Sequence, residues 1–163
     1  MHSNTYKHIK SEGVRAGIVR ARFNEDVTGG LLDGAHEALV DAGVKPEDIT
    51  LVEVPGSLEI PTAASILLEH KTLDVVVTLG CIVKGETAHD EYIATSVYQA
   101  LVRLAMHTGV PITMGILTVN TIEQARARSG TGGMNRGREA ALSGLEMVQA
   151  LKPLKTEKRD GLA

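Results

Sequence analysis

The segment GCIVKGETAHDEY, residues 80–92, places a dense group of ionisable side chains directly after an apolar run. The apolar residues 73–83 are typical of a strand that is covered on both faces of a parallel sheet. The ionisable residues that follow this strand are Lys84, Glu86, His89, Asp90 and Glu91. A titratable imidazole beside a turn that can hold an anion is what acid–base chemistry on a phosphorylated substrate requires. The segment is therefore a candidate active-site loop.

The turn formed by Gly85, Glu86 and Thr87 is the candidate anion site. Backbone N–H groups and a hydroxyl at the start of a helix bind anions without a dedicated motif. The turn lacks the glycine spacing of a P-loop or of a dinucleotide-binding fingerprint, so no nucleotide cofactor is indicated. His89 has two interpretations: a proton-transferring group, or an ordinary histidine in the first turn of a helix.

The single cysteine of the chain, Cys81, lies inside the apolar run. One cysteine forms neither an internal disulfide nor a multi-cysteine zinc site, and we expect no metal centre. Cys81 is either a small buried packing residue or a catalytic thiol, and its apolar surroundings favour packing.

Further candidate residues follow the other strands of the chain. Phe23 is the only phenylalanine, and it either closes the core or offers a flat platform to a ligand. Glu59 either complements the dipole of the next helix or contacts a ligand. Four arginines within residues 126–138 are either solvated helix charges or a phosphate clamp, because a guanidinium is permanently charged and binds bidentately. They are Arg126, Arg128, Arg136 and Arg138.

Length, composition and charge exclude several classes of protein. The chain has 163 residues, of which 43% are hydrophobic, and this fits one domain, residues 1–163, with a normal core. The net charge is −3 and no basic stripe is present, so nucleic-acid binding is not indicated. The longest apolar runs are shorter than the ~20 residues of a membrane span, and the N-terminus lacks the apolar segment of a signal peptide. We expect a cytoplasmic protein without membrane contact.

Strand and helix patterns alternate along the chain. Strands are predicted at 14–23, 49–54, 73–83 and 112–119, and helices at 28–43, 60–70, 89–107 and 136–151. Asn24 is predicted as a helix N-cap and Gly43 as a C′ residue. Thr121 and Gln124 are predicted to form the capping box of an additional short helix. Residues 1–12 and 153–163 are expected to be flexible ends.

This alternation predicts the α/β class, with a three-layer α/β/α arrangement. A central, mainly parallel four-stranded sheet is expected, flanked by helices on both faces. Ligands of such sheets bind beyond the carboxyl ends of the strands. The segments that follow the predicted strands are 23–24, 55–59, 84–89 and 120–121, and all the unusual polar chemistry lies in them. One site at one edge of the sheet is therefore predicted.

Five segments resemble the lumazine synthase family in their order and spacing. They are ARFN (21–24), VPGSLEIP (54–61), LGCIVKGETAHDEYIA (79–94), GILTVNTIEQARARSGT (115–131) and NRGREAALSGLEM (135–147). The resemblance covers nearly the whole chain. It implies a transferase without metal or organic cofactor, which forms 6,7-dimethyl-8-ribityllumazine in the penultimate step of riboflavin biosynthesis. The implied substrates are 5-amino-6-(D-ribitylamino)uracil and 3,4-dihydroxy-2-butanone 4-phosphate, with release of phosphate and water.

The resemblance also implies roles for individual residues. His89 matches the family's proton-shuttling histidine, with Glu91 as the acidic residue beside it. Phe23 would stack on the pyrimidine, and Arg128 would hold the phosphate. The other substrate-binding residues that the resemblance implies are Ser57, Leu58, Glu59, Cys81, Ile82, Val83, Gly85, Glu86, Thr87, Met114 and Arg136.

The family's pockets form between neighbouring subunits of a pentamer. The resemblance therefore implies a homo-oligomer of pentamers in which Met114, Arg128 and Arg136 serve the pocket of the adjacent chain. Pentamer, decamer and icosahedral shell all stay open, and the short turn GTGGMNRG (130–137) favours the shell. Riboflavin synthase is a further expected partner.

Four positions depart from the family pattern. Asp90 stands where the family usually has an aromatic residue, and Met114 stands where an aromatic often covers the uracil. Arg136 and Gly132 stand where lysine is common. Asp90 and Glu91 would favour the charged form of the imidazole if they lie close to it. These departures make weaker substrate binding an expectation. They leave an alternative, a non-catalytic paralogue that binds flavin or lumazine or forms a shell.

Overall fold

The computed structural model describes residues 6, 9–131 and 133–160. The strands are β1 (Ala16–Ala21), β2 (Ile49–Val54), β3 (Val75–Val83) and β4 (Ile112–Val119). The helices are α1 (Glu25–Asp41), α2 (Ile60–His70), α3 (His89–Thr108), α4 (Ile122–Arg126) and α5 (Arg136–Asp160), with 3-10 helices η1 (Pro46–Asp48) and η2 (Ser57–Glu59). None of these described helices combines the length and the apolar character that a membrane crossing demands.

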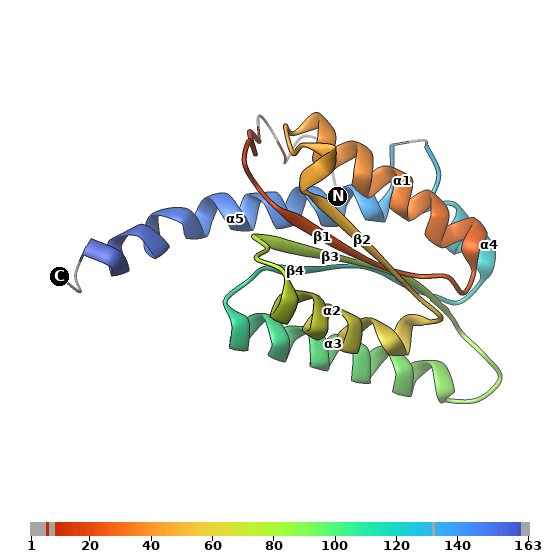
Figure 1. The fold of residues 1–163 in the computed structure, drawn as a ribbon. Coiled ribbons are helices and arrows are strands. Elements are labelled where there is room, and N and C mark those ends of the chain that lie inside the picture. The colour runs from red at the N-terminus through yellow and green to blue at the C-terminus, as the bar shows by residue number, and fades with distance from the viewer. Residues whose placement is uncertain (1–5, 7–8, 132, 161–163) are drawn as a thin grey trace.

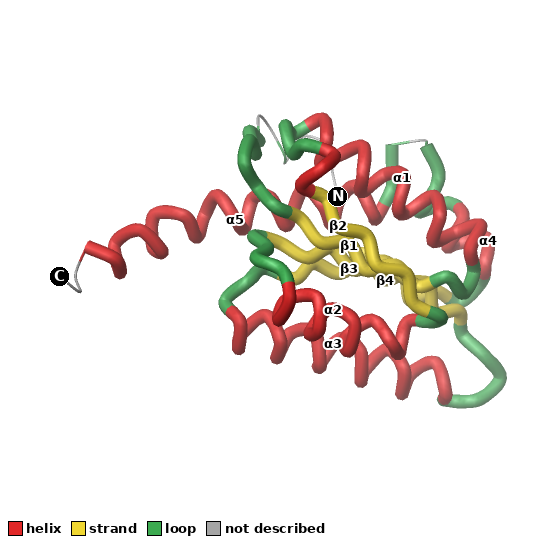
Figure 2. The backbone as a smooth tube through the Cα atoms, viewed as in Figure 1, coloured by secondary structure: helices red, strands yellow, loops and turns green. Residues whose placement is uncertain are grey.

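The four strands form one sheet in the order β2-β1-β3-β4. Each pairing between neighbouring strands is parallel, so the carboxyl ends of all four lie at the same edge. Figures 1 and 2 show α1, α4 and α5 on one side of the sheet and α2 and α3 on the other. The predicted three-layer α/β/α fold is therefore confirmed.

The central strand β3 explains why the run 73–83 is mainly apolar. Val77 and Leu79 belong to the cluster of buried residues beneath α1 and α5. Val76 and Ile82 belong to the cluster beneath α2 and α3. Helices cover both faces of this strand, so its one polar side chain, Thr78, is fully buried and donates its hydroxyl to the carbonyl of Thr113 at 2.8 Å.

Helices α1 and α5 approach each other so closely that the contact requires glycine. A Cβ atom added to Gly137 would overlap the backbone carbonyl of Leu31, and one added to Gly30 would overlap the carbonyl oxygen of Ser129. Backbone atoms of packed helices have no room to move aside as the tip of a flexible side chain does. The contact therefore holds the start of α5, and the loop that precedes it, against α1.

Two predicted helix signals have clear outcomes in the structure. Gly43 has a positive φ of 99° and donates its N–H to the carbonyl of Val40 at 2.9 Å, which confirms it as the C′ residue of α1. The hydroxyl of Thr121 accepts the N–H of Gln124 at 3.3 Å, as a helix cap does. The Gln124 side chain reaches back one residue further than in a standard capping box and accepts the N–H of Asn120 at 2.9 Å.

The predicted end of the last helix at Leu151 is wrong. Helix α5 continues through Pro153 to Asp160, and Figure 1 shows its second half extending beyond the sheet. A proline inside a helix removes one hydrogen bond and costs about 3 kcal/mol, but the Leu, Lys and Glu residues around it favour helix. Residues 1–5, 7–8 and 161–163 of the predicted flexible ends lie outside the described residues, as does Gly132.

Candidate active site

The loops after β1, β2 and β3 enclose a cavity of about 490 Å³, which we name the platform pocket. The predicted site residues that line it are Phe23, Ser57, Leu58, Glu59, Cys81, Ile82, Val83, Gly85, Thr87 and His89. Gly56, Asp90 and Ile93 complete the lining, whereas Glu86 is not part of it. Residues from three separate loops thus meet beyond the strand ends, where a ligand of a parallel sheet is expected.

Phe23 is an exposed aromatic residue of the platform pocket, so its interpretation as a core residue is wrong. Its side chain is 70% exposed. The N–H of Phe23 donates to the carbonyl of Pro55 at 3.0 Å, and that of Arg22 donates to the carbonyl of Val54 at 2.8 Å. These bonds continue the pairing of β1 with β2 beyond the strand ends. The backbone of Phe23 is therefore held in place while its ring stays open to a ligand.

Asn24 has a positioning role that the sequence reasoning missed. It occupies the N-cap position of α1, as predicted, but its backbone is left-handed, with φ 58° and ψ 54°, and its side chain makes no cap hydrogen bond to α1. Instead, Asn24 Nδ2 donates to the carbonyl of Cys81 at 3.3 Å. This bond ties the end of β1 to the end of β3. The available signal was the residue type, because asparagine enters the left-handed region more readily than most residues.

Ser57 and Glu59 come from η2, which packs against β3. The Oε2 atom of Glu59 accepts the N–H of Gly56 at 2.9 Å, so this carboxylate closes its own turn as well as lining the pocket. Ser57 is buried, and a Cβ atom at Gly80 would lie 2.6 Å from its Oγ atom. The glycine in β3 therefore makes room for η2 at the pocket wall.

Cys81 is a buried packing residue, as its apolar surroundings indicated, with 3% of its surface exposed. Burial raises the pKa of the Cys81 thiol to about 11, opposed by the hydrogen bond with the Asn24 side chain and assisted by the charge of Asp26. Because the thiolate is the nucleophile, a thiol with this pKa is protonated near neutral pH. The structure therefore favours packing over a catalytic thiol.

We expect iodoacetamide to alkylate Cys81 at pH 8 more than about 100-fold more slowly in the folded protein than in denaturant. The unfolded thiol has a pKa of about 8.5, whereas the folded thiol must lose its proton near pH 11. The folded-state rate should therefore rise with pH up to that value. Mass spectrometry of quenched samples measures both rates, and equal rates in the two states would contradict the assignment.

The loop between β3 and α3 is closed by Asp90. Its Oδ1 atom accepts the N–H of Gly85 at 3.2 Å, which turns the carboxylate toward the candidate anion turn. Glu91 lies with Lys84 in a neighbouring cavity of about 580 Å³. Among the described residues, no hydrogen bond or ion pair joins His89 to Asp90 or Glu91. In the described part of the chain, Asp90 and Glu91 therefore make no direct polar contact with the His89 imidazole.

Three further predicted residues line a second cavity of about 330 Å³, which we name the arginine pocket, whereas Glu86 lines neither cavity. Met114, Arg128 and Arg136 belong to it, and it runs along β4, an edge strand of the sheet. No lining residue is common to the arginine pocket and the platform pocket. Within one chain, the predicted site residues therefore form two separate groups.

The structure separates the four candidate arginines by their partners. Arg126 pairs with Asp26 at 2.9 Å, and Arg138 pairs with Glu37 at 3.6 Å and with Asp41 at 3.5 Å, so both are structural links to α1. Arg128 Nη1 donates to the carbonyl of Gln124 at 2.8 Å. Arg136 pairs with Glu139 in the first turn of α5. Only Arg128 and Arg136 of these four line the arginine pocket.

Comparison with known proteins identifies the family of this chain. The model of the 6,7-dimethyl-8-ribityllumazine synthase family matches residues 13–152. The chain belongs to this family. A lumazine synthase of Aquifex aeolicus (strain VF5) is 44% identical over 147 residues, which cover 90% of this chain and 96% of that protein. The family resemblance inferred from the five sequence segments is thus confirmed.

The segment that matches the lumazine synthase family includes both groups of site residues. The matched residues 13–152 contain the platform pocket and the arginine pocket. They also contain Asn24, Asp90 and the close contact between α1 and α5. The match ends at Lys152, one residue before Pro153, and does not include the last turns of α5.

Proposed function

We propose that this chain is a 6,7-dimethyl-8-ribityllumazine synthase, a transferase of riboflavin biosynthesis. It condenses 5-amino-6-(D-ribitylamino)uracil with 3,4-dihydroxy-2-butanone 4-phosphate and releases phosphate and water. The observation that carries the proposal is the family match over residues 13–152. The platform pocket supports it, because a ring, polar groups and an imidazole line one cavity of about 490 Å³.

The uracil substrate needs a flat surface and polar partners. Phe23 stacks on the pyrimidine, a role that suits its exposed ring. Ser57 and Glu59 bind the polar and ribityl groups, and Leu58 adds apolar contact beside them. Backbone groups of residues 81–83 border the ring, since the side chain of Cys81 is buried in packing.

The phosphorylated substrate needs an anion site and a proton carrier. Its carbonyl condenses with the 5-amino group of the uracil to an imine with loss of water, phosphate is eliminated, and the ribitylamino nitrogen closes the second ring with loss of a further water. Glu86 and Thr87 offer backbone N–H groups and a hydroxyl to the phosphate, whereas the N–H of Gly85 is bonded to Asp90. His89 lies at the start of α3 in the same pocket and transfers the protons that imine formation and elimination require.

The arginine pocket completes the site of an adjacent subunit. In this proposal Arg128 and Arg136 hold the phosphate from across the interface, and Met114 covers the uracil with a thioether contact. The position of this pocket along an edge strand supports the arrangement, because an edge strand is open to a second chain. The protein is a cytoplasmic homopentamer whose short turn at residues 130–137 favours further assembly into an icosahedral shell. Riboflavin synthase is its proposed partner.

The proposed function is tested by mixing the purified, assembled protein with both substrates. Lumazine fluorescence should rise, and inorganic phosphate should be released in equal molar amount. A rise in both signals that depends on protein concentration supports the proposal. Absence of both signals in assembled protein would contradict it and would favour the non-catalytic binding or shell-forming alternative.

Replacement of His89 by alanine should lower kcat about tenfold and leave both KM values nearly unchanged. Acid–base groups contribute about 10²- to 10⁴-fold in many enzymes, but proximity of two reactive substrates supplies much of this rate. Initial rates of lumazine fluorescence measure the change. His107→Ala is the matched control, because His107 is exposed at the opposite end of the same helix. A His89→Ala enzyme with altered KM and normal kcat would contradict the proton-transfer role.

A further inference from the structure

The loop between α4 and α5, residues 127–135, positions the two arginines of the arginine pocket. Arg128 lies near its start, and Arg136 directly follows it as the first residue of α5. The N–H of Arg136 donates to the carbonyl of Arg128 at 2.9 Å, so the two backbones are joined directly. The orientation of both guanidinium groups therefore depends on how this loop is closed.

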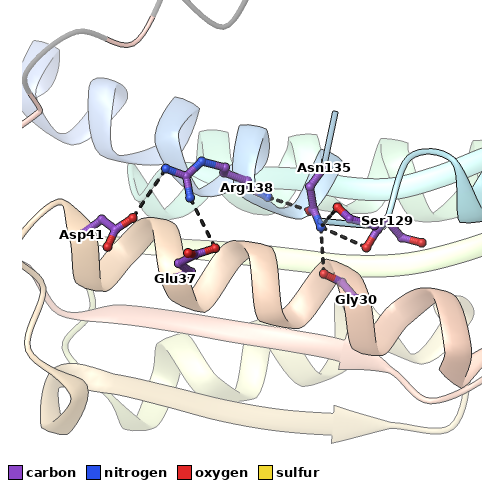
Figure 3. A network of polar contacts seen from close by, with 7 residues as sticks. Gly30, Glu37, Asp41, Ser129, Asn135 and Arg138 are labelled. Atoms are coloured by element: carbon purple, nitrogen blue, oxygen red, sulfur yellow. Dashed lines mark hydrogen bonds and ion pairs between the residues drawn. The ribbon is translucent and has the colours of Figure 1, made fainter. Parts of the chain in front are cut away.

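Asn135 is the side chain that closes the loop (Figure 3). Its Nδ2 atom donates to the carbonyls of Gly30 at 2.8 Å, Ser129 at 3.0 Å and Gly130 at 3.2 Å. Its Oδ1 atom accepts the N–H of Arg138 at 3.1 Å. One amide group thus connects α1, the loop and the first turn of α5.

The packing around Asn135 leaves this amide no alternative position. The residue is 8% exposed. A Cβ atom at Gly34 would overlap the amide, and a Cβ atom at Gly30 would overlap the carbonyl oxygen of Ser129. Glycine at positions 30 and 34 of α1 therefore leaves room for the Ser129 carbonyl and the Asn135 amide to pack against the helix. A buried amide with all its polar atoms engaged holds its neighbours rigidly, since each lost bond leaves a buried polar group unpaired.

We propose that Asn135 is a positioning residue for the Arg128 and Arg136 pair and thereby sets the affinity for the phosphorylated substrate. The inference rests on the proposed function, in which this pair holds the phosphate. Preformed orientation reduces the conformational entropy that the two long side chains lose when they bind phosphate. Asn135 itself is buried and lines neither the platform pocket nor the arginine pocket, so it acts through the two arginines.

The test compares steady-state kinetics of the assembled wild-type protein with Asn135→Asp. Aspartate has nearly the same shape but lacks the amide N–H groups, so three carbonyls lose their donor. We expect KM for 3,4-dihydroxy-2-butanone 4-phosphate to rise about fivefold to tenfold, with KM for the uracil substrate and kcat within about twofold. If this variant does not fold, Asn135→Ser is used, because its hydroxyl keeps one donor. The same selective KM increase is expected there.

Two comparisons separate positioning from a general loss of stability. Arg138→Gln removes the ion pairs to Glu37 and Asp41 in the same region but leaves the loop bonds intact, so its KM should match the wild type. In an Arg128→Ala background, Asn135→Asp should add less than about twofold to KM, because the group that it positions is already gone.

The possible results distinguish this inference from the proposed function. A selective KM increase for Asn135→Asp that disappears in the Arg128→Ala background supports the inference. If Arg128→Ala alone raises KM and folded Asn135 variants do not, the positioning role is overturned and the proposed function stands. If Arg128→Ala leaves KM unchanged while turnover is normal, the phosphate role of Arg128 fails, and the inference fails with it.

Discussion

Replacement of Arg128 by alanine should raise KM for 3,4-dihydroxy-2-butanone 4-phosphate about 10- to 100-fold and change KM for the uracil substrate little. Charge-assisted hydrogen bonds to phosphate contribute about 1.5–3 kcal/mol, which corresponds to this range. In the structure, Arg128 Nη1 is engaged with the carbonyl of Gln124. This bond orients the guanidinium while its remaining N–H groups stay available in the arginine pocket. Initial rates at varied concentrations of each substrate measure both KM values.

The matched control for this experiment is Arg126→Ala. Arg126 lies two residues earlier and carries the same charge, but it pairs with Asp26 on α1 and does not line the arginine pocket. Its replacement should leave both KM values within about twofold of the wild type, since a rim-exposed ion pair contributes little. Unchanged kinetics of Arg128→Ala, or equal effects of the two replacements, would remove Arg128 from the site.

The largest expected effect on stability is that of Gly137→Ala. The added methyl group would overlap the backbone of Leu31 on α1, so the two helices would have to separate. Overpacking of a core by a side-chain clash costs about 1–3 kcal/mol, and a clash with backbone atoms should cost about 3 kcal/mol or more. Thermal unfolding followed by circular dichroism at fixed protein concentration should show a strongly lowered Tm or no cooperative transition.

Gly29→Ala is the matched control for Gly137→Ala. Gly29 lies in α1 next to Gly30, but a Cβ atom there would have no neighbour within 4 Å. Alanine is a better helix former than glycine by about 1 kcal/mol, so this variant should be slightly more stable than the wild type. Equal Tm values for Gly137→Ala and the wild type would show that α1 and α5 do not approach as closely as described.

The fold could be predicted because its main signals are local. Apolar runs with short polar connections indicate alternating strands and helices, and a fully apolar run indicates a central strand. The rule that ligands bind beyond the carboxyl ends of parallel strands then placed Phe23, residues 57–59 and His89 at one edge. The structure brings them together in one cavity.

The details that could not be predicted depend on contacts between distant parts of the chain. The Asn24 side chain donates to the carbonyl of Cys81, and the Asn135 side chain donates to the carbonyl of Gly30. Because each partner is far away along the chain, no spacing in the sequence reveals either role. The four arginines within residues 126–138 look alike in sequence. Only the carboxylates of α1 distinguish Arg126 and Arg138 from the pair in the arginine pocket.

The division of the site residues between two cavities has a genetic consequence in the proposed pentamer. In that pentamer each chain would contribute its platform pocket to one interface and its arginine pocket to the other. In a ring assembled from two alleles, one damaged in the platform pocket and the other in the arginine pocket, some interfaces would therefore join the two intact halves and form a working site. Variants with a defective platform pocket and variants with a defective arginine pocket would consequently complement each other, although both changes lie in one gene.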